Sequence, residues 1–262
     1  MFEDNMKKAI FFLFLSLSAL AQTKSEKQAF TSGEWLRYKM SYSGFLRAGT
    51  AELSVEETEI DGKKVFHTTG KGWTTGMIKW FFKVEDDYQS YFDKDSVFPY
   101  LFKRKINEGG YKKHVHTTFN HDTNKALVQD FLKQKDTLID FKAVQDMLSS
   151  FYFLRNLDVS SMKPGDEIKL DMFLDAKTYN FKLRYIGNED LKIRKGRVKT
   201  MKFVPLVQAG RIFKEKESVT IWITADDNKI PIKLKANLAV GSLRAELEAY
   251  KGLAHSFKKI YN

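Results

Sequence analysis

Apolar and polar residues alternate through most of the chain after Gly33, and this two-residue period constrains the fold more than any other feature. In the first such run, Leu36, Tyr38, Met40 and Tyr42 would share one face of a strand. The residues between them are charged or hydroxylated, as expected of a strand with one buried and one wet face. This pattern is typical of antiparallel sheets.

The alternation recurs often enough to predict a sheet of many strands. A hairpin is predicted at Asp61-Gly62, and a turn at Asn120–Asn124. So many strands must curl, stack or close, so we expect curved antiparallel sheets in an open barrel or a sandwich. The further predicted strands are 51–55, 63–69, 79–93, 96–106, 111–119, 168–174, 179–185, 219–223, 230–234 and 243–249.

One central segment has a helical period instead. Phe141, Val144, Leu148, Phe151 and Leu154 are spaced three and four residues apart. This spacing predicts one central α-helix near 140–156, with Asp140 as its N-cap. The chain is thus expected to form a single β-rich domain over 33–262, in which the helix joins two strand blocks, 33–133 and 166–251.

The N-terminus predicts export. Residues 1–21 combine a positive start and a short apolar run with a small-x-small exit at Ala19 and Ala21, as a secretory signal peptide does. Met6 is an alternative start to Met1. The polar residues 22–32 are expected to be flexible or extended.

The composition narrows the location further. The chain has no cysteine, so we expect neither a lipidated cysteine after the signal nor disulfides. No second apolar run approaches the length of a membrane span. The sequence therefore predicts a periplasmic or outer-envelope protein without lipidation or a transmembrane anchor.

The net charge of +11 indicates anionic surroundings. Outside the cytoplasm, the anions available are lipid head groups, glycans and acidic proteins, and nucleic acid is not expected. The densest basic run is 192–199, which would be either a solvated hairpin or a grip for an anionic head group. General surface solubility is the alternative explanation of the charge.

An aromatic segment provides the ligand-binding prediction. Trp73, Met77, Trp80, Phe81 and Phe82 lie within ten residues and exceed what one strand face needs. They could form a pocket rim or a surface that faces lipid or sugar. The alternative is buried core at a sheet corner. Tyr152 on the predicted helix could line the same cavity or could equally belong to the core.

Catalytic and metal-binding patterns are weak. His114 and His116 alternate on one strand face, so both could face one ion with His121 or Asp122 as a third ligand. The flanking lysines favour a solvated strand face instead. There is no Gly-x-Ser-x-Gly elbow, no cysteine nucleophile and no phosphate-cradling glycine loop. We therefore expect no cofactor, and an enzyme is not favoured.

Several segments together identify a family. They run in order over almost the whole mature chain and are GEWLRY at 33–38, AGTAEL at 48–53, FKVEDDY at 82–88, EGGY at 108–111, DMLSSFYFLR at 146–155, PGD at 164–166 and WITADD at 222–227 with Pro231. In these the chain resembles the exported bacterial family of domain of unknown function 3108, in a form like that of Bacteroidota. The resemblance implies an envelope protein without an assigned activity and supplies no catalytic residues. The order of strand block, helix and strand block is also similar to the open barrels of lipoprotein carriers, a likeness of fold alone.

The function predicted from these features is non-enzymatic binding of an apolar or lipid-linked envelope component, such as a lipid or glycan. The first alternative is a structural or assembly protein that binds a protein partner through its sheet edges. The second is a metal-dependent hydrolase.

Overall fold

The computed structural model describes residues 28–193, 196–206, 219–238 and 240–260. The predicted signal peptide at 1–21 lies outside the described residues, as do two members of the basic run at 192–199. Of the segment expected to be flexible, only 28–32 is described. Within the described part of the chain, no helix is long and apolar enough to cross a membrane.

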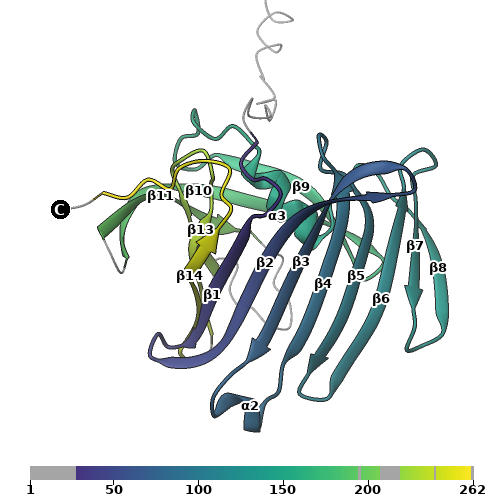
Figure 1. The fold of residues 1–262 in the computed structure, drawn as a ribbon, viewed down its shortest axis with the longest axis horizontal. Coiled ribbons are helices and arrows are strands. Elements are labelled where there is room, and N and C mark those ends of the chain that lie inside the picture. The colour runs from purple at the N-terminus through teal and green to yellow at the C-terminus, as the bar shows by residue number, and fades with distance from the viewer. Residues whose placement is uncertain (1–27, 194–195, 207–218, 239, 261–262) are drawn as a thin grey trace, which may run out of the picture.

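The chain forms one antiparallel sheet in which the two strand blocks meet side by side (Figure 1). The strand order is β8-β7-β6-β5-β4-β3-β2-β1-β14-β13-β12-β11-β10-β9. The strands are β1 Trp35–Tyr42, β2 Leu46–Ile60, β3 Lys63–Thr74, β4 Glu85–Asp93, β5 Pro99–Glu108, β6 Tyr111–Asn120, β7 Lys125–Asp130, β8 Lys135–Asp140, β9 Glu167–Leu174, β10 Lys177–Ile193, β11 Gly196–Pro205, β12 Val219–Thr224, β13 Pro231–Asn237 and β14 Ser242–Lys251. The two helices are α2 Ile78–Phe81 and α3 Met147–Arg155. The prediction of a mainly β chain with curved antiparallel strands is confirmed.

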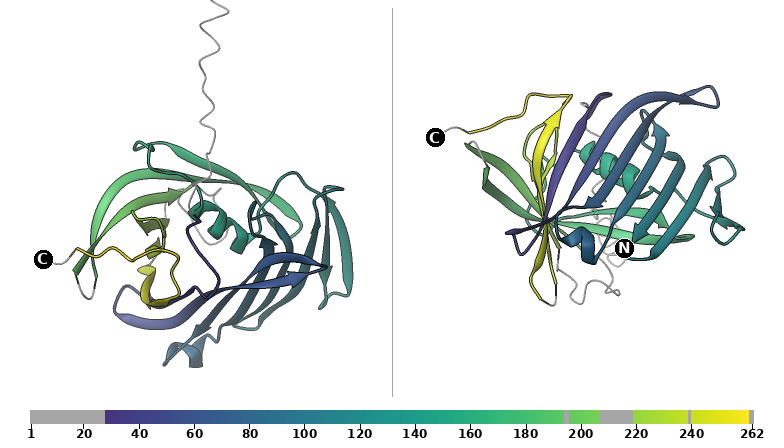
Figure 2. Two further views of the ribbon diagram at one scale, coloured as in Figure 1. Left: turned by 45° about the horizontal axis from the view of Figure 1, so that its top comes forward. Right: turned by 60° about the horizontal axis from the view of Figure 1, so that its bottom comes forward.

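The sheet curls around α3, which lies in its interior (Figure 2). The first and last strands join the two blocks, because Tyr38 on β1 pairs with Leu247 on β14 and with Ala51 on β2. Gly70 shows how closely the helix approaches β3, since a Cβ there would lie 3.1 Å from a side-chain carbon of Leu148. A single curled sheet with a helix inside thus takes the place of two stacked sheets.

Contacts across the interior hold the two edge regions of the sheet together. Gln145, just before α3, bonds the edge strand β9 through its backbone, at 2.8 Å to Asp171 and 2.8 Å to Phe173. The β9–β10 turn also reaches across the interior, where the Asp175 carboxylate accepts hydrogen bonds from Arg104 and Lys113. Although burial opposes ionisation, these cations hold the pKa of Asp175 below its usual value.

Two local predictions need correction. The helix spans Met147–Arg155 and does not begin near 140, because Lys135–Asp140 pairs with β7 as the edge strand β8. The predicted strand at 79–93 is interrupted by α2, so β4 begins only at Glu85. Both errors have one cause: short apolar runs fit either period, and strand pairing decides between them.

Asp146 is the N-cap of α3 in place of the aspartate predicted at 140. Its carboxylate accepts hydrogen bonds from the backbone N–H of Leu148 and Ser149, both at 2.8 Å, and the Ser149 hydroxyl accepts one from the Asp146 N–H. Ser90 on β4 donates to the same carboxylate at 2.5 Å. This reciprocal capping box fixes where the helix starts and ties it to the sheet.

The burial of Asp146 predicts a pH-dependent stability. Burial raises its pKa to about 6, while the surrounding hydrogen bonds oppose the rise. The folded state therefore keeps a proton that the unfolded state loses, and this group's contribution to the free energy of unfolding falls as pH rises from about 4 to 6. Asp146→Asn should abolish that part of the slope, whereas Asp146→Ala should lose about 0.5–2 kcal/mol of capping.

Urea denaturation of the wild type and the Asn variant across this pH range checks the prediction. It would be contradicted if the difference between the two free energies of unfolding were constant from pH 4 to pH 6.

Two of the described residues of the segment expected to be flexible or extended lie in the core. Ala29 and Phe30 are buried, and the Ala29 N–H donates to the Asn156 side chain at 2.9 Å. The Phe30 ring contacts Tyr152, with ring centroids 4.6 Å apart. Polar composition suggested flexibility, but one buried ring is enough to fix this short segment.

Candidate functional site

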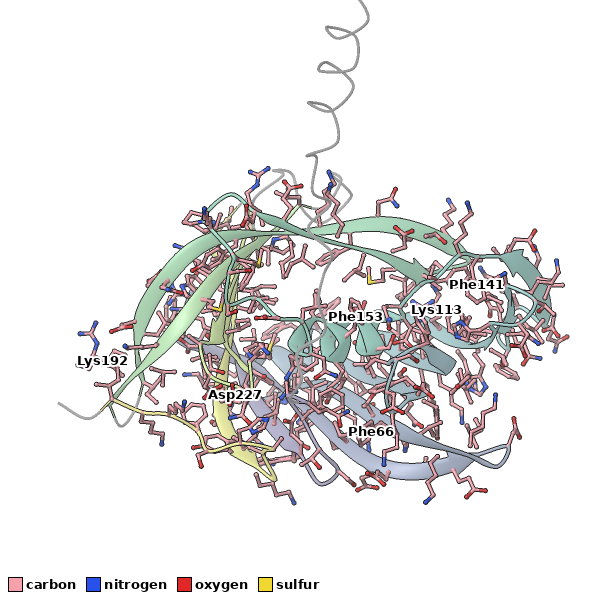
Figure 3. All side chains as sticks on the ribbon, turned by 90° about the horizontal axis from the view of Figure 1, so that it is seen from above. Phe66, Lys113, Phe141, Phe153, Lys192 and Asp227 are labelled. Carbon is pink, nitrogen blue, oxygen red and sulfur yellow. The ribbon has the colours of Figure 1, made fainter. Side chains whose placement is uncertain are left out.

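A cavity of about 360 Å³ lies between α3 and the strands β1, β2 and β9–β14. Its size is within the range of small-molecule sites in proteins. Figure 3 looks into this interior from above, with Phe153 of α3 at its centre. Apart from a tyrosine, an arginine and a lysine, the lining side chains are apolar, among them Met40, Leu53, Phe151, Leu154, Ile168, Leu183, Phe203, Ile221, Ile223 and Leu234.

The alternation of the sequence explains why these side chains face inward. On β12, Ile221 and Ile223 line the cavity, whereas the buried ring of Trp222 lies on the other face. The Trp222 indole N–H donates to Glu189 at 2.9 Å, and the Lys202 ammonium lies 5.4 Å from the ring centroid. On β12 the inner face is therefore apolar, whereas the outer face holds a tryptophan covered by charged side chains.

Tyr38 supplies the one hydroxyl of the lining. The residue is buried, and its Oη has no hydrogen-bond partner among the residues that the structure describes. Burial raises the pKa of Tyr38, so the hydroxyl stays protonated. An unpaired buried hydroxyl is unfavourable by about 1–3 kcal/mol, and a ligand oxygen could relieve this penalty.

Two cations lie at the same cavity. Lys229, in the β12–β13 turn, is almost fully buried, and this burial lowers its pKa. The Arg155 guanidinium uses four of its five N–H groups within the fold: it holds both carboxylate oxygens of Glu34, at 2.6 and 2.7 Å, and donates to the carbonyls of Ala29 and Asn228, both at 3.0 Å. Arg155 is therefore structural, and Tyr38 and Lys229 are the polar groups that a ligand could reach.

The structure separates Tyr152 from the other five residues that the sequence predicts to bind a ligand. Tyr152 is fully buried against Phe30 and Phe92, away from the aromatic segment. Trp73 lies at the end of β3, and the others lie in and around α2, where Met77, Trp80, Phe81 and Phe82 are exposed. That segment is not buried core, so this alternative for it is wrong.

The histidines do not assemble a three-ligand metal site. The His114 and His116 rings lie 5.3 Å apart on β6, with Phe131 against both. His121 lies at the other end of this strand, where its Nε2 is 2.7 Å from the Pro99 carbonyl oxygen. Among the residues that the structure describes, no group of three or more His, Asp or Glu side chains could hold a metal ion.

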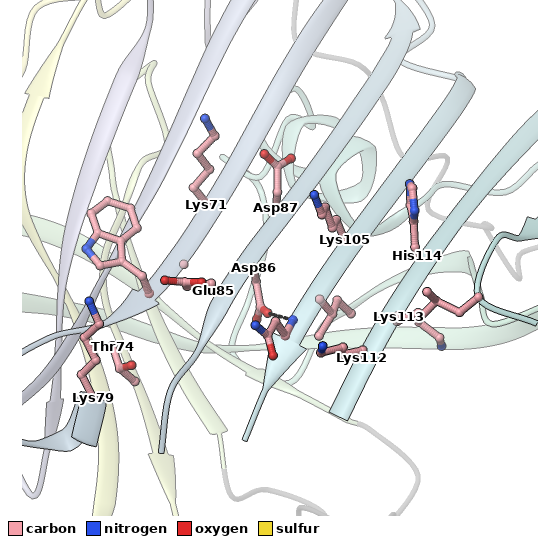
Figure 4. A pocket seen from close by; sticks show the side chains of 15 residues that line it. Lys71, Thr74, Lys79, Glu85, Asp86, Asp87, Lys105, Lys112, Lys113 and His114 are labelled. Carbon is pink, nitrogen blue, oxygen red and sulfur yellow. Dashed lines mark hydrogen bonds between the residues drawn. The ribbon is translucent and has the colours of Figure 1, made fainter. Parts of the chain in front are cut away.

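A second and more open pocket, of about 650 Å³, lies beside α2 and across β3–β6 (Figure 4). Lysines and carboxylates share its lining, for example Lys71, Asp87, Lys105 and Lys112. Two carboxylates of this lining already have partners: Glu85 pairs with Lys83 at 2.8 Å, and Asp86 accepts a hydrogen bond from the Asn107 N–H at 3.1 Å. The apolar cavity is therefore the better candidate site.

Sequence reasoning missed the cavity although it found most of its walls. The inward faces of β10, β12 and β13 were each predicted as apolar, but their convergence on α3 depends on how the strands curl. The signal that could have indicated a cavity is the pair of small residues Ala51 and Ala245 among the larger side chains of the inner face.

Comparisons with known proteins agree with this architecture. A family model described as "Protein of unknown function (DUF3108)" matches residues 37–248. No curated protein matches the chain. A beta-barrel-like protein of domain of unknown function DUF1849 from Brucella abortus is 13% identical with a TM-score of 0.55, over 83% of this chain and 96% of that one. This likeness concerns the fold alone.

Two further solved structures are less similar. A candidate lipoprotein from Parabacteroides distasonis has a TM-score of 0.35 and 11% identity, over 84% of this chain and 96% of that one. A candidate exported protein with a YmcC-like fold from Bacteroides fragilis has a TM-score of 0.34 and 10% identity, over 85% and 97%. Similarity at this level supports no conclusion about the present chain.

Proposed function

This chain belongs to the DUF3108 family of proteins of unknown function, and from that premise we propose that it binds an apolar chain without transforming it. The proposed ligand is a lipid, or the lipid part of a lipid-linked glycan. The proposed location is the cell envelope, reached through the signal peptide at 1–21, in a member of the family like those of Bacteroidota. The observation that carries the proposal is the apolar cavity between α3 and the second strand block.

The chemistry of the lining supports an amphiphile. Each methylene moved from water into such a cavity is worth about 0.8 kcal/mol, so a single acyl chain could supply the affinity. The free Oη of Tyr38 could donate to a ligand oxygen, and Lys229 would favour an anionic head group. A purely polar ligand has little to bind there.

Native mass spectrometry of the protein purified from its own envelope tests the proposal directly. We expect a co-purifying lipid or lipid-linked glycan. If none is found, and if cis-parinaric acid, a fluorescent fatty acid, neither binds nor raises the melting temperature, the proposal is wrong.

A cavity-filling variant locates the site. Ile221→Trp would place an indole in the cavity and should weaken cis-parinaric acid binding by about tenfold or more, since it displaces several methylenes of the ligand. Thr220→Trp is the matched control, because the neighbouring residue on β12 faces outward and should leave binding unchanged. Fluorescence titration measures both.

Folding must be verified by circular dichroism, since overpacking can destabilise a core. If Ile221→Trp does not fold, Ala245→Phe fills the same cavity from β14. Wild-type affinity in a folded cavity-filling variant would show that the ligand binds elsewhere.

A further inference from the structure

Large apolar side chains are concentrated at one end of the curled sheet. Five hairpin tips at this end, which we call the aromatic end, are 43–47, 75–84, 108–113, 130–135 and the described residues of 237–242; α2 lies at its lowest point in Figure 1. Each tip exposes at least one large apolar side chain. Examples are Trp80 (87% exposed), Phe81 (85%), Phe45 (83%) and Val240 (77%), together with Tyr111 and Leu132.

The opposite end of the sheet differs. Its connections are 60–64, 93–98, 120–125, 140–146 and 225–230, and within these described segments no large apolar side chain is exposed. Val97 and Phe141, which lie in two of them, are buried. Exposed aromatic residues at hairpin tips are thus a property of one end and not of the surface in general.

Backbone and side-chain contacts join the tips into one surface. Tyr42 Oη donates to the Val240 carbonyl at 2.8 Å, and the Thr75 N–H donates to the Ala48 carbonyl at 3.1 Å. The Gly109 N–H donates to the Lys83 carbonyl at 2.9 Å. The ring of Phe82 also covers Gly109 so closely that a Cβ there would lie 2.2 Å from a ring carbon. The aromatic residues of α2 are therefore held on the sheet.

The aromatic end is also the more basic of the two ends. The five tips of the aromatic end contain seven Lys or Arg and two Asp or Glu, whereas the five connections at the opposite end contain six and eight. Lys79 lies within α2, directly before the exposed Trp80 and Phe81, and Lys133 is 76% exposed beside Leu132. Aromatic residues interleaved with lysines suit the boundary of a bilayer with an anionic surface.

We propose that the aromatic end docks onto an anionic phospholipid surface, with the α2 tip inserted into the interfacial region. A protein partner would need a surface that is both acidic and apolar. An anionic bilayer has this combination throughout, because its negative head groups lie directly above apolar chains. This goes beyond binding of an apolar chain in the cavity, because the docking residues belong to other elements. The two proposals can fail independently.

The test is co-sedimentation of the mature chain with phosphatidylcholine vesicles, with and without a third of phosphatidylglycerol. We expect stronger binding to the anionic vesicles, which weakens at high salt. Trp80→Ser with Phe81→Ser should reduce binding by about tenfold or more, because two exposed rings no longer enter the interface. Lys79→Gln with Lys133→Gln should weaken binding to anionic vesicles only, by about fivefold per lysine.

Leu138→Ser with Tyr179→Ser is the matched control, since both residues are exposed but lie on strands and outside the five tips. This variant and Ile221→Trp should bind vesicles like the wild type, whereas Trp80→Ser with Phe81→Ser should still bind cis-parinaric acid. Equal binding of the tip and control variants would overturn the proposal, as would no wild-type binding. A dimer that the tip substitutions dissociate, seen by analytical ultracentrifugation, would assign the surface to a second copy instead.

Discussion

Arg155→Met is expected to lower the free energy of unfolding by about 3–5 kcal/mol, because it leaves the Glu34 carboxylate buried without its partner. Both side chains are almost completely excluded from solvent. The two parallel hydrogen bonds between them, at 2.6 and 2.7 Å, are the geometry that makes an arginine–carboxylate pair strong.

The position of Arg155 in the chain adds to the effect. It is the last residue of α3, and besides Glu34 it holds the carbonyls of Ala29 and Asn228. Its guanidinium carbon also lies 5.6 Å from the centroid of the Phe30 ring. One side chain thus joins the N-terminal segment, the helix and the β12–β13 turn, so its loss should loosen all three.

The Arg37–Glu52 pair gives the matched control. Its nitrogen–oxygen distance of 2.7 Å is equally short, but Arg37 is 42% exposed. Arg37→Met should therefore change stability by about 0–1 kcal/mol. In urea denaturation, Arg155→Met with Glu34→Leu should recover part of the loss, because no unpaired charge remains. Equal effects of Arg155→Met and Arg37→Met would contradict the prediction.

Phe30→Ala is expected to be of similar severity, about 3–5 kcal/mol, because the ring fills the centre of an aromatic cluster. Its centroid lies 5.3 Å from that of Phe66, 6.2 Å from that of Phe92 and 4.6 Å from that of Tyr152. These neighbours come from two strands and the helix and cannot all move into the space that the ring leaves. A cavity would remain and add to the lost burial.

Phe45→Ala is the control for this prediction, since Phe45 is exposed at a hairpin tip. We expect a change within about 0.5 kcal/mol. Thermal and urea unfolding, followed by circular dichroism, measure both variants. A mild effect of Phe30→Ala would mean that the segment before β1 contributes little to the fold.

The sequence was a good guide wherever the decisive pattern is local. Alternation predicted the inward face of β12, with Ile221 and Ile223, without knowledge of what they face. It failed at α2 and β8, which are short and depend on their neighbours: Lys135–Asp140 is a strand because β7 offers a partner. The helix was predicted from its apolar spacing, but its start is set by the capping box of Asp146 and Ser149, whose carboxylate also bonds Ser90 on another element.

The sequence predicts the candidate binding residues less well, because their neighbours come from distant parts of the chain. Trp80 and Phe81 are predicted from the sequence to belong to a pocket rim or to a surface that faces lipid or sugar, and they are exposed, but their neighbours at the aromatic end come from other hairpins. From the sequence, Tyr152 fits either a cavity shared with the aromatic segment or the core. In the structure it belongs to the core, against Phe30, and lies apart from that segment.

The sequence by itself determined the mainly β class, the family and which residues of most strands would be buried, because a two-residue period is a property of adjacent residues. Tertiary structure decided the rest. Only pairing between β1 and β14 places Tyr38 opposite Leu247, and only folding brings Arg155 to Glu34 across 121 residues. The cavity and the aromatic end arise where such distant segments meet, and no local pattern encodes that meeting.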